Sequence, residues 1–357
     1  MDYATARQNM VESQIRPNKV TDPQLIDALR SLPRELFVPK AMRGIAYVDD
    51  DVAVAPDRYL MEPMVLARLL QEAAVAATDM DNAERRVLVL HNPALLERGL
   101  SGASKTLSVN LQVLMPGERA RPHRHTMAAL RFVLEGSGAV TVVDGKTCPM
   151  ERGDMILTPG WTWHEHMHDG AGRMVWIDVL DVPLHQFLDN GVFEPGPAHD
   201  VPDLAPDSAF AAPGLTPESP SGAIAYSPMF RYPWAATVEA LAAMPRGTDG
   251  SRALRYTDPT TGGAAMTTID CYVLGLDKGR PTRPYRTNSS AVCVVVDGEG
   301  ATEVDGTTLT WRENDVFALP HGGWISHQAA SAEARLFQVS DREILHRMGL
   351  LREELGS

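Results

Sequence analysis

Three histidines in the middle of the chain have the spacing of a metal site. His123 and His125 stand at positions i and i+2 of the segment "PHRHTMAALRFVLEG", so a strand would place both imidazoles on one face. His164 follows in "WTWHEH", which an antiparallel barrel could set beside the first segment. Three neutral imidazoles would suit Fe, Zn, Cu or Ni, and three protein ligands leave coordination positions open for chemistry. The alternative is that these histidines are polar residues of an exposed face.

The same frame occurs a second time, without the His-x-His pair. The first copy contains Gly117, His123, His125, Gly153, Asp154, Pro159 and His164, and the second contains Gly279, Tyr285, Thr287, Asn314, Asp315, Pro320 and His327. The matching order and spacing indicate one internal duplication. Because one imidazole does not hold a labile dication, the second copy, in which we expect only His327 to remain, is predicted to be structural.

Hydrophobic patterning predicts a helical start followed by two β-rich blocks. "TDPQLIDALRSL" has the pattern of a helix with Leu25, Ile26, Leu29 and Leu32 on one face, and "EPMVLARLLQEAAVAA" predicts a second helix. Later, short runs of Val, Leu, Ile and Thr alternate with turns that contain Gly and Asp. The predicted divisions are a helical segment 1–76, a metal-binding barrel 77–193, a linker with a short helix 194–252, a second barrel without metal 253–345 and a tail 346–357. "DREILHRMGLLREELG" predicts a polar helix at the end.

The composition limits the partners of the chain. A net charge of −13 argues against a nucleic-acid groove or an anionic membrane surface as a partner. The cysteines form no CxxC pair and their number is odd, which argues against a disulfide framework and for a reducing cytoplasm; they are Cys148, Cys271 and Cys293. No stretch has the apolar length of a signal peptide core or a membrane span.

The metal frame resembles the cupin superfamily, and its repetition resembles bicupins, which implies a mainly β fold of two jelly-roll barrels with an N-terminal helical segment. A closer resemblance is to gentisate 1,2-dioxygenases and their relatives that cleave salicylate or 1-hydroxy-2-naphthoate. It is carried by "AERRVLVLHNP", "LQVLMPGE", "HRHT", "ALRFVLEG", "PMERGDMILTPGWTWHEH", "WIDVLDVPL", "LRYTDPTTGGAAMTTIDCYVLGL" and "RPYRTN". Many cupins add a glutamate shortly after the second histidine. Ala129 and Leu130 stand there in this chain, so the expected ligand set is three histidines without a carboxylate.

The resemblance implies one Fe(II) per subunit, held by His123, His125 and His164, and a substrate that is an aromatic acid with an adjacent hydroxyl. Such enzymes open the ring between the carbons that bear these two groups, using O₂. Gentisate is the first expectation, and salicylate, a 5-substituted salicylate or 1-hydroxy-2-naphthoate is the alternative. A homotetramer is also implied.

Residue roles follow from the matched motifs. Arg131, placed by its spacing on the same strand face as His125, would pair the substrate carboxylate, with Gln112 and Trp176 as further substrate contacts. Arg86, or its neighbour Arg85 in its place, would add a second cation, since consecutive strand residues point to opposite faces. The residues expected to take part in the chemistry are His166, Asp178 and Gln112. Ser108 and Met127 depart from related sequences, and the smaller Ser108 could admit a bulkier ring.

Residues 1–76 resemble a different family, the protein-L-isoaspartate O-methyltransferases. That family continues with a glycine-rich turn that cradles S-adenosylmethionine, whereas this chain continues with "AAVAATDMDNAERRVLVLHNP". We therefore expect no methyl transfer. The other alternative is a metal-binding cupin without catalytic activity, which metal identity and O₂ consumption would distinguish from a dioxygenase.

Overall fold

The computed structural model divides the chain into two compact units, Met1–Arg86 and Val87–Ser357. It describes residues 2–18, 20, 23–55, 58–60, 63, 86–212, 214–218 and 225–356. Each unit is described by itself. None of the described helices is long and apolar enough to cross a membrane.

The first unit is mostly helical and has its own small core. Its elements are α1 (Tyr3–Met10), η1 (Val11–Ile15), η2 (Arg16–Asn18), α2 (Pro23–Ser31), η3 (Arg34–Leu36), η4 (Lys40–Ile45), β1 (Val52–Ala55) and β2 (Arg58–Leu60). The predicted helix at "PQLIDALRS" is confirmed as α2, with Ile26 and Leu29 buried. Leu32 was wrongly placed on the buried face, because α2 ends before it and its side chain is 49% exposed. The second predicted helix, residues 62–77, falls almost entirely outside the described residues.

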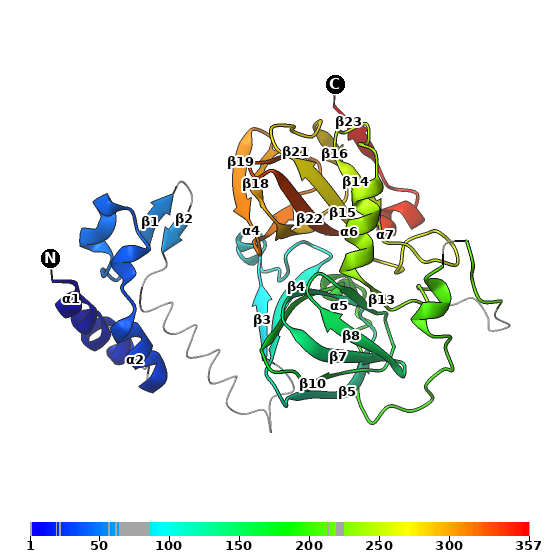
Figure 1. Cartoon of the computed structure of the whole chain (residues 1–357), viewed down its shortest axis with the longest axis horizontal. Helices are drawn as coiled ribbons and strands as arrows, with labels where there is room; N and C mark the ends of the chain where they lie inside the picture. The colour runs from blue at the N-terminus through cyan, green and yellow to red at the C-terminus, as the bar shows by residue number, and fades with distance from the viewer. Residues whose placement is uncertain are drawn as a thin grey trace. The chain divides into compact units, whose positions relative to one another are not determined.

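The second unit contains two barrels, each made of two antiparallel sheets (Figure 1). In the first barrel the strand orders are β12-β5-β10-β7-β8 and β13-β9-β6-β11-β4-β3. Its strands are β3 (Arg86–Leu90), β4 (Ser108–Leu114), β5 (Arg119–His125), β6 (Ala129–Glu135), β7 (Ser137–Val143), β8 (Lys146–Glu151), β9 (Met155–Thr158), β10 (His164–His168), β11 (Met174–Leu180), β12 (Phe193–Pro195) and β13 (Arg231–Tyr232). Helices α4 (Pro93–Leu96) and α5 (Val182–Leu188) belong to the same part of the chain.

The second barrel repeats this plan. Its strand orders are β14-β15-β22-β17-β20 and β19-β18-β21-β16-β23. Its elements are β14 (Arg252–Arg255), β15 (Asp270–Asp277), β16 (Tyr285–Thr287), β17 (Ala291–Asp297), β18 (Glu299–Val304), β19 (Thr307–Arg312), β20 (Val316–Leu319), β21 (Trp324–Ala329), β22 (Glu333–Ser340), α7 (Arg342–Arg347) and β23 (Glu353–Leu355). The predicted mainly β fold of two barrels with an N-terminal helical segment is confirmed.

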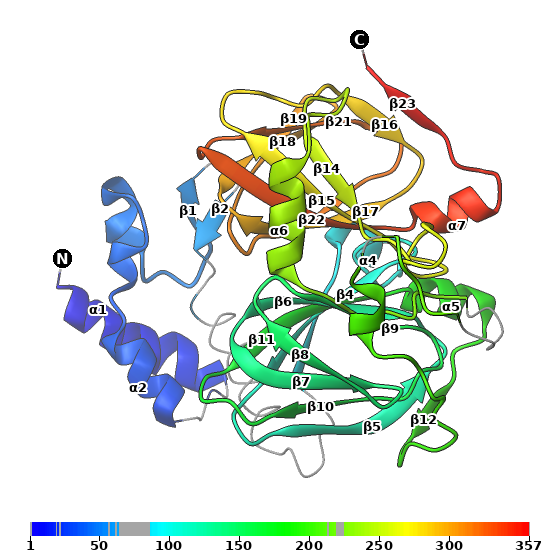
Figure 2. The same ribbon diagram turned by 45° about the vertical axis from the view of Figure 1, so that its right-hand side comes forward.

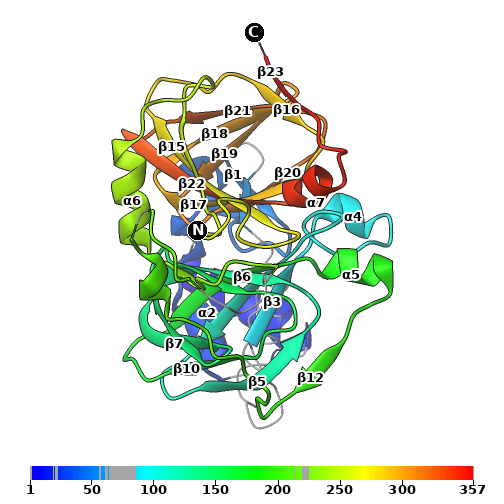
Figure 3. The same cartoon turned by 90° about the vertical axis from the view of Figure 1, so that its right-hand side faces the viewer.

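The two barrels share one hydrophobic core. Phe132 of β6 stacks on Phe337 of β22 with ring centroids 4.1 Å apart, and buried residues of both barrels join the same cluster. Polar contacts tie the barrels together as well: Thr268 donates to Asp181, and Thr106 donates to Asp341. The second barrel therefore supports the first through a continuous interior, as Figure 3 shows for the stacked sheets.

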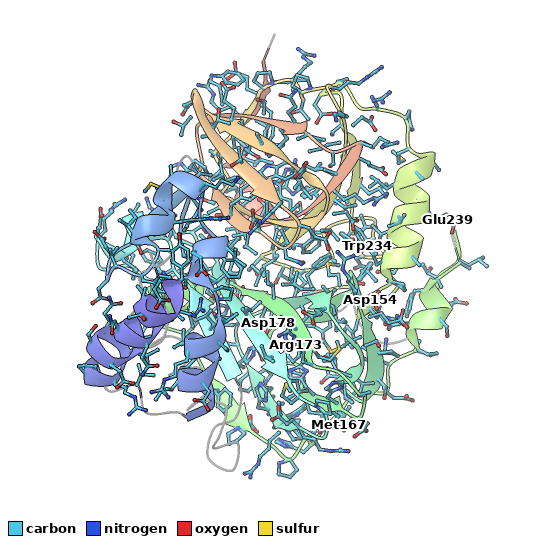
Figure 4. All side chains as sticks on the ribbon, turned by 60° about the vertical axis from the view of Figure 1, so that its left-hand side comes forward. Asp154, Met167, Arg173, Asp178, Trp234 and Glu239 are labelled. Atoms are coloured by element: carbon cyan, nitrogen blue, oxygen red, sulfur yellow. The ribbon has the colours of Figure 1, made fainter. Side chains whose placement is uncertain are left out.

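Residues 194–252 do more than connect the barrels. Strands β12 and β13 extend the two sheets of the first barrel, and η5 (Asp207–Phe210) precedes β13. The predicted helix at "TVEALAAM" is confirmed as α6 (Trp234–Ala243), which runs along the side of both barrels (Figure 2). Its first residue, Trp234, donates its backbone N–H to Asp154 at 2.9 Å (Figure 4).

The end of the chain differs from the predicted long polar helix. Helix α7 stops at Arg347, and Gly349 has φ +70°, a left-handed conformation that ends a helix. The chain then forms β23, which pairs with β16 through Leu355 opposite Tyr285 and Glu353 opposite Thr287. Backbone pairing within the barrel therefore takes the place of the last helical turns.

Candidate metal centre

The strand pairing of the first barrel brings the three histidines together. His164 lies opposite His123 where β10 pairs with β5, and His125 follows two residues after His123 on the same face. Their ring centroids are 4.2 Å apart for His123 and His164 and 4.8 Å apart for His125 and His164. One ring nitrogen from each lies within 4.8 Å of the other two. Among the described residues this is the group of three potential ligands that the structure assembles.

The hydrogen bonds of the histidines fix which nitrogen faces the centre. The Nδ1 atoms of His123, His125 and His164 lie 2.8 Å, 2.8 Å and 3.0 Å from the backbone carbonyl oxygens of Arg121, Met127 and Thr162, respectively. A carbonyl oxygen only accepts, so each Nδ1 carries the proton, and in the neutral ring the lone pair is then on Nε2. This is the second-sphere pattern of histidines that bind metals.

The environment of His164 keeps it neutral. Its pKa is lowered well below the ordinary value, first because of burial and then because of repulsion from Arg131 and the neighbouring histidines. Its Nε2 is buried and has no hydrogen-bond partner in the structure. A neutral, oriented imidazole with an unused lone pair is the form that coordinates a metal ion, so the residues present fit such an ion.

Arg131, Asp178 and Gln112 form a buried polar group in the same barrel. Nε of Arg131 lies 3.2 Å from Oδ1 of Asp178, with the two side chains 1% and 2% exposed, and Gln112 donates its amide N–H to Oδ2 of Asp178. The expectation that Arg131 shares a strand with His125 is wrong. His125 ends β5, whereas Arg131 belongs to β6 in the facing sheet, and closure of the barrel brings its charge near His164.

His166 and Trp176 fill the interior behind the three histidines. His166 is fully buried, its ring centroid is 6.1 Å from that of His164 and 5.5 Å from that of Trp176, and its Nδ1 lies 2.9 Å from Oγ1 of Thr141. Trp176 is 1% exposed, and its Nε1 has no hydrogen-bond partner in the structure. Both residues that the sequence singled out therefore face the inside of the barrel.

The structure places the other sequence-derived candidates as follows, and the side chains of two of them are not described. Arg86 opens β3, but its side chain is not among those described, and Arg85 lies outside the described residues. Ser108 is buried at the start of β4 opposite Leu180. Met127 contributes through its backbone, because its carbonyl oxygen accepts the proton of His125.

Three residues of the site were not anticipated. Thr158 accepts a hydrogen bond from Nη1 of Arg131 at 3.2 Å, Phe193 of β12 stacks on His123 with centroids 5.3 Å apart, and Arg124 lies between the rings of Trp161 and Trp163. The alternation His123–Arg124–His125 could have placed Arg124 on the opposite face. Phe193 could not be found in this way, because it reaches the site only after α5 returns the chain to β5.

The second barrel keeps none of the three ligands. In the first barrel His164 pairs with Val143 and His166 with Thr141; in the second, Ile325 pairs with Val304 and His327 with Thr302. The tight Asp-Gly hairpins that precede them are anchored alike, since Trp163 and Trp324 donate their backbone N–H to Asp144 and Asp305.

His327 therefore corresponds to His166, and Ile325 stands in the place of His164. The expectation that His327 is a retained ligand position is wrong. The sequence alignment was out of register by two residues at this point, because both segments contain a Trp-x-x-His pattern. Tyr285 faces Ile325 as His123 faces His164, so every ligand of the first barrel has been exchanged in the second.

Comparisons with known proteins find similarity to different families in the two parts of the chain. Residues 110–180 match the cupin domain model, and residues 5–81 match the model of protein-L-isoaspartate(D-aspartate) O-methyltransferase. An isoaspartate methyltransferase of Methylorubrum extorquens is 35% identical over 22% of this chain and 34% of that protein.

The longer similarity is to ring-cleaving dioxygenases. Gentisate 1,2-dioxygenase 1 of Aquipseudomonas alcaligenes is 36% identical over 83% of this chain and 86% of that protein. The 5-aminosalicylate 1,2-dioxygenase of a Comamonas species is 35% identical over 86% and 85%. The crystal structure of a salicylate 1,2-dioxygenase from Pseudoaminobacter salicylatoxidans with gentisate matches with a TM-score of 0.73 and 36% identity, over 81% of this chain and 83% of that one.

Proposed function

We propose a substrate class and residue roles for this chain, which belongs to the family of gentisate and salicylate 1,2-dioxygenases, ring-cleaving enzymes built on the cupin fold. Its substrate would be gentisate or a close 2-hydroxybenzoate, opened between the carbons that bear the carboxylate and the hydroxyl, with both atoms of O₂ entering the product. Salicylate, 5-substituted salicylates and 1-hydroxy-2-naphthoate are the alternative substrates within the same reaction.

The observation that carries the proposal is the pairing of a three-histidine centre with a buried arginine. His123, His125 and His164 present three neutral nitrogens, a set that would hold one Fe(II) and leave positions open. Held by these three histidines, such an ion would supply a Lewis-acidic, redox-active centre for oxidation of an aromatic ring by O₂. Since all three ligands are uncharged, the positive charge of the ion is available to an anionic chelate.

The remaining residues would bind and orient the substrate. Arg131 offers a planar guanidinium with five N–H donors, so its contacts with Asp178 and Thr158 are compatible with a further hydrogen bond to the substrate carboxylate. Asp178 would hold Arg131 in place, and Gln112 would complete that group. Trp176 would wall the pocket, and Arg86 would add a second cation.

His166 would act as a general acid or base that accepts or donates the proton of the substrate hydroxyl. It is buried beside His164 and has a hydroxyl partner in Thr141, so its ring is oriented before substrate arrives. A cytoplasmic location, which rests on the cysteine pattern, and a homotetrameric assembly, which rests on family resemblance, stay predictions, as do the predicted domain boundaries.

The decisive experiment measures O₂ consumption by protein loaded anaerobically with Fe(II). Gentisate, salicylate, 5-aminosalicylate and 1-hydroxy-2-naphthoate are offered separately, and the ring-opened product is identified by mass spectrometry. We expect one O₂ per molecule of one of these acids, and no consumption by a His123→Ala variant. A protein that binds iron fully and consumes no O₂ with any of the four would contradict the proposal and favour a binding cupin.

A further inference from the structure

The second barrel has a cavity at the position that holds the metal centre in the first. The cavity has a volume of about 310 Å³, and its lining includes Tyr272, Leu274, Tyr285, His327, Gln338 and Ser340. Strand register relates these residues to the first site: Tyr285 replaces His123, His327 replaces His166, and Gln338 replaces Asp178. The second barrel, coloured yellow to red in Figure 1, therefore has a cavity at this position, and different residues line it.

The exchanges remove the means to bind a metal or an aromatic carboxylate. In the second barrel Gln338 pairs with Cys293 of β17, whereas in the first barrel Asp178 pairs with Arg131 of β6. A neutral thiol therefore stands where the first site has a buried cation. Arg342 does reach the cavity, but it forms a two-point ion pair with Glu353 at 2.8 Å and 2.7 Å. Asp249 adds another carboxylate to the lining. The cavity thus carries more negative than positive charge, which disfavours an anion.

Hydrogen bonds identify His327, whose side chain is part of the cavity lining, as a donor. Oγ1 of Thr302 accepts the indole N–H of Trp311 at 2.9 Å and lies 2.8 Å from Nδ1 of His327. We assign the hydroxyl proton of Thr302, which is fully buried, to Nδ1, which leaves the ring proton on Nε2. His327 is 1% exposed, and its Nε2 has no hydrogen-bond partner in the structure. A buried donor of this kind calls for an acceptor.

We propose that this second cavity binds an uncharged phenol of one-ring size, whose oxygen accepts the Nε2 proton of His327. Tyr272, Tyr285 and Leu274 supply aromatic and aliphatic surface for the ring. The amide of Gln338, which also lines the cavity, can meet a second ring substituent. An apolar cavity of roughly 150 Å³ already admits benzene. The larger volume here suits a ring with one or two hydroxyl groups.

Isothermal titration calorimetry of the metal-loaded full chain tests the proposal. The probe is resorcinol, whose hydroxyl groups are not adjacent and do not chelate a metal together, and benzoate serves as an anionic ring of similar size. We expect one resorcinol per chain. The His327→Leu variant should weaken resorcinol binding by about tenfold, whereas a variant with both His123→Ala and His125→Ala should retain it within about twofold. Benzoate is compared in this double variant, which lacks the metal centre, and should bind there about tenfold or more weakly than resorcinol.

A second variant keeps the test decisive if His327→Leu does not fold. Leu274→Trp fills the cavity from its wall without touching the histidine, and its folding can be checked by its melting temperature. Undiminished resorcinol binding in Leu274→Trp would overturn the proposal, as would equal affinity for benzoate or the absence of resorcinol binding. Loss of binding only in the His123 and His125 variant would place the phenol at the metal centre, which also overturns it. Because the proposal concerns the second barrel, its failure leaves the dioxygenase function untouched.

Discussion

A histidine can serve as a metal ligand or as a hydrogen-bond donor, depending on which ring nitrogen carries the proton. In this chain the local backbone makes that choice. The Nδ1–H of His164 donates a hydrogen bond to the carbonyl oxygen of Thr162, which leaves Nε2 available to bind a metal ion. Nδ1 of His327 instead lies beside the hydroxyl of Thr302, which accepts a hydrogen bond from the indole N–H of Trp311. We therefore assign the ring proton of His327 to Nε2. The two barrels therefore differ in chemistry through hydrogen bonds as well as residue identity.

The burial of His327 predicts a pH dependence of stability. Burial lowers the pKa of His327 to about 4 from an ordinary 6.5, so the unfolded chain binds the extra proton between these two values. The free energy of unfolding should therefore rise with pH through this window, and the contribution should be complete above pH 6.5 and lost as the pH falls toward 4. Its size is on the order of 3 kcal/mol.

The measurement compares urea unfolding of the natural chain and of His327→Gln across that pH window. The difference between the two should shrink toward acid pH, whereas His321→Gln, a change at an exposed histidine, should follow the natural chain throughout. A constant difference at all pH values would show that His327 does not titrate as its burial implies.

The buried pair of Arg131 and Asp178 predicts a non-additive mutation cycle. Arg131→Met leaves a buried carboxylate without its cation and should lower the free energy of unfolding by about 3–5 kcal/mol. Combining it with Asp178→Leu should restore most of that loss, because no buried charge remains. Urea unfolding of the natural chain, the two single variants and the double variant measures the coupling.

The matched control for this cycle is an exposed pair. Arg173 and Glu135 lie 2.9 Å apart with side chains 59% and 54% exposed, and Arg173→Gln should cost no more than about 1 kcal/mol. Figure 4 labels Arg173 and Asp178, one from the exposed pair and one from the buried pair. Equal losses at the two pairs would contradict the argument from burial.

At the scale of elements, the features that follow from sequence patterns were predicted, whereas those that depend on how the barrel closes were not. The His-x-His strand, helix α6 and the repeated barrels were visible because alternation, a run of helix-forming residues and a duplicated frame can be read along the chain. The place of Arg131 in the facing sheet and the return of Phe193 to His123 depend on how the barrel closes, which spacing does not encode. The register of β21 was missed because both segments contain a Trp-x-x-His pattern, which aligned His327 with His164. Its pairing with Thr302 shows that it corresponds to His166.

The turn between β8 and β9 depends on a glycine that α6 covers. Gly153 has φ +86°, and a Cβ atom there would lie 2.3 Å from Cγ of Trp234, the first residue of α6. Gly153→Ala should therefore combine backbone strain with overpacking and cost about 2–5 kcal/mol. Thermal unfolding would show it, with Gly172→Ala as the control, because nothing lies within 4 Å of a Cβ at Gly172. Equal melting temperatures for the two variants would mean that α6 can shift away without loss.

At the scale of the whole molecule, the chain joins two units with separate cores. The core of the first unit is formed by residues between Met10 and Leu60, and the metal centre, both barrels and their shared core lie in the second. The methyltransferase-like part matches its family over residues 5–81, without the glycine-rich turn that would follow.

This separation predicts that a chain reduced to residues 83–357 keeps its chemistry. It retains β3 and every described residue around the three histidines, so its iron content and its rate of O₂ consumption per iron should match those of the full chain within about twofold. Metal analysis and O₂ uptake on both proteins measure this, with His123→Ala in each background as the blank. The full chain should also transfer no methyl group from S-adenosylmethionine to an isoaspartyl peptide. A truncated chain that folds and binds iron but turns over much more slowly would show that the first unit contributes to the active site, and methyl transfer by the full chain would show that it has a catalytic role of its own.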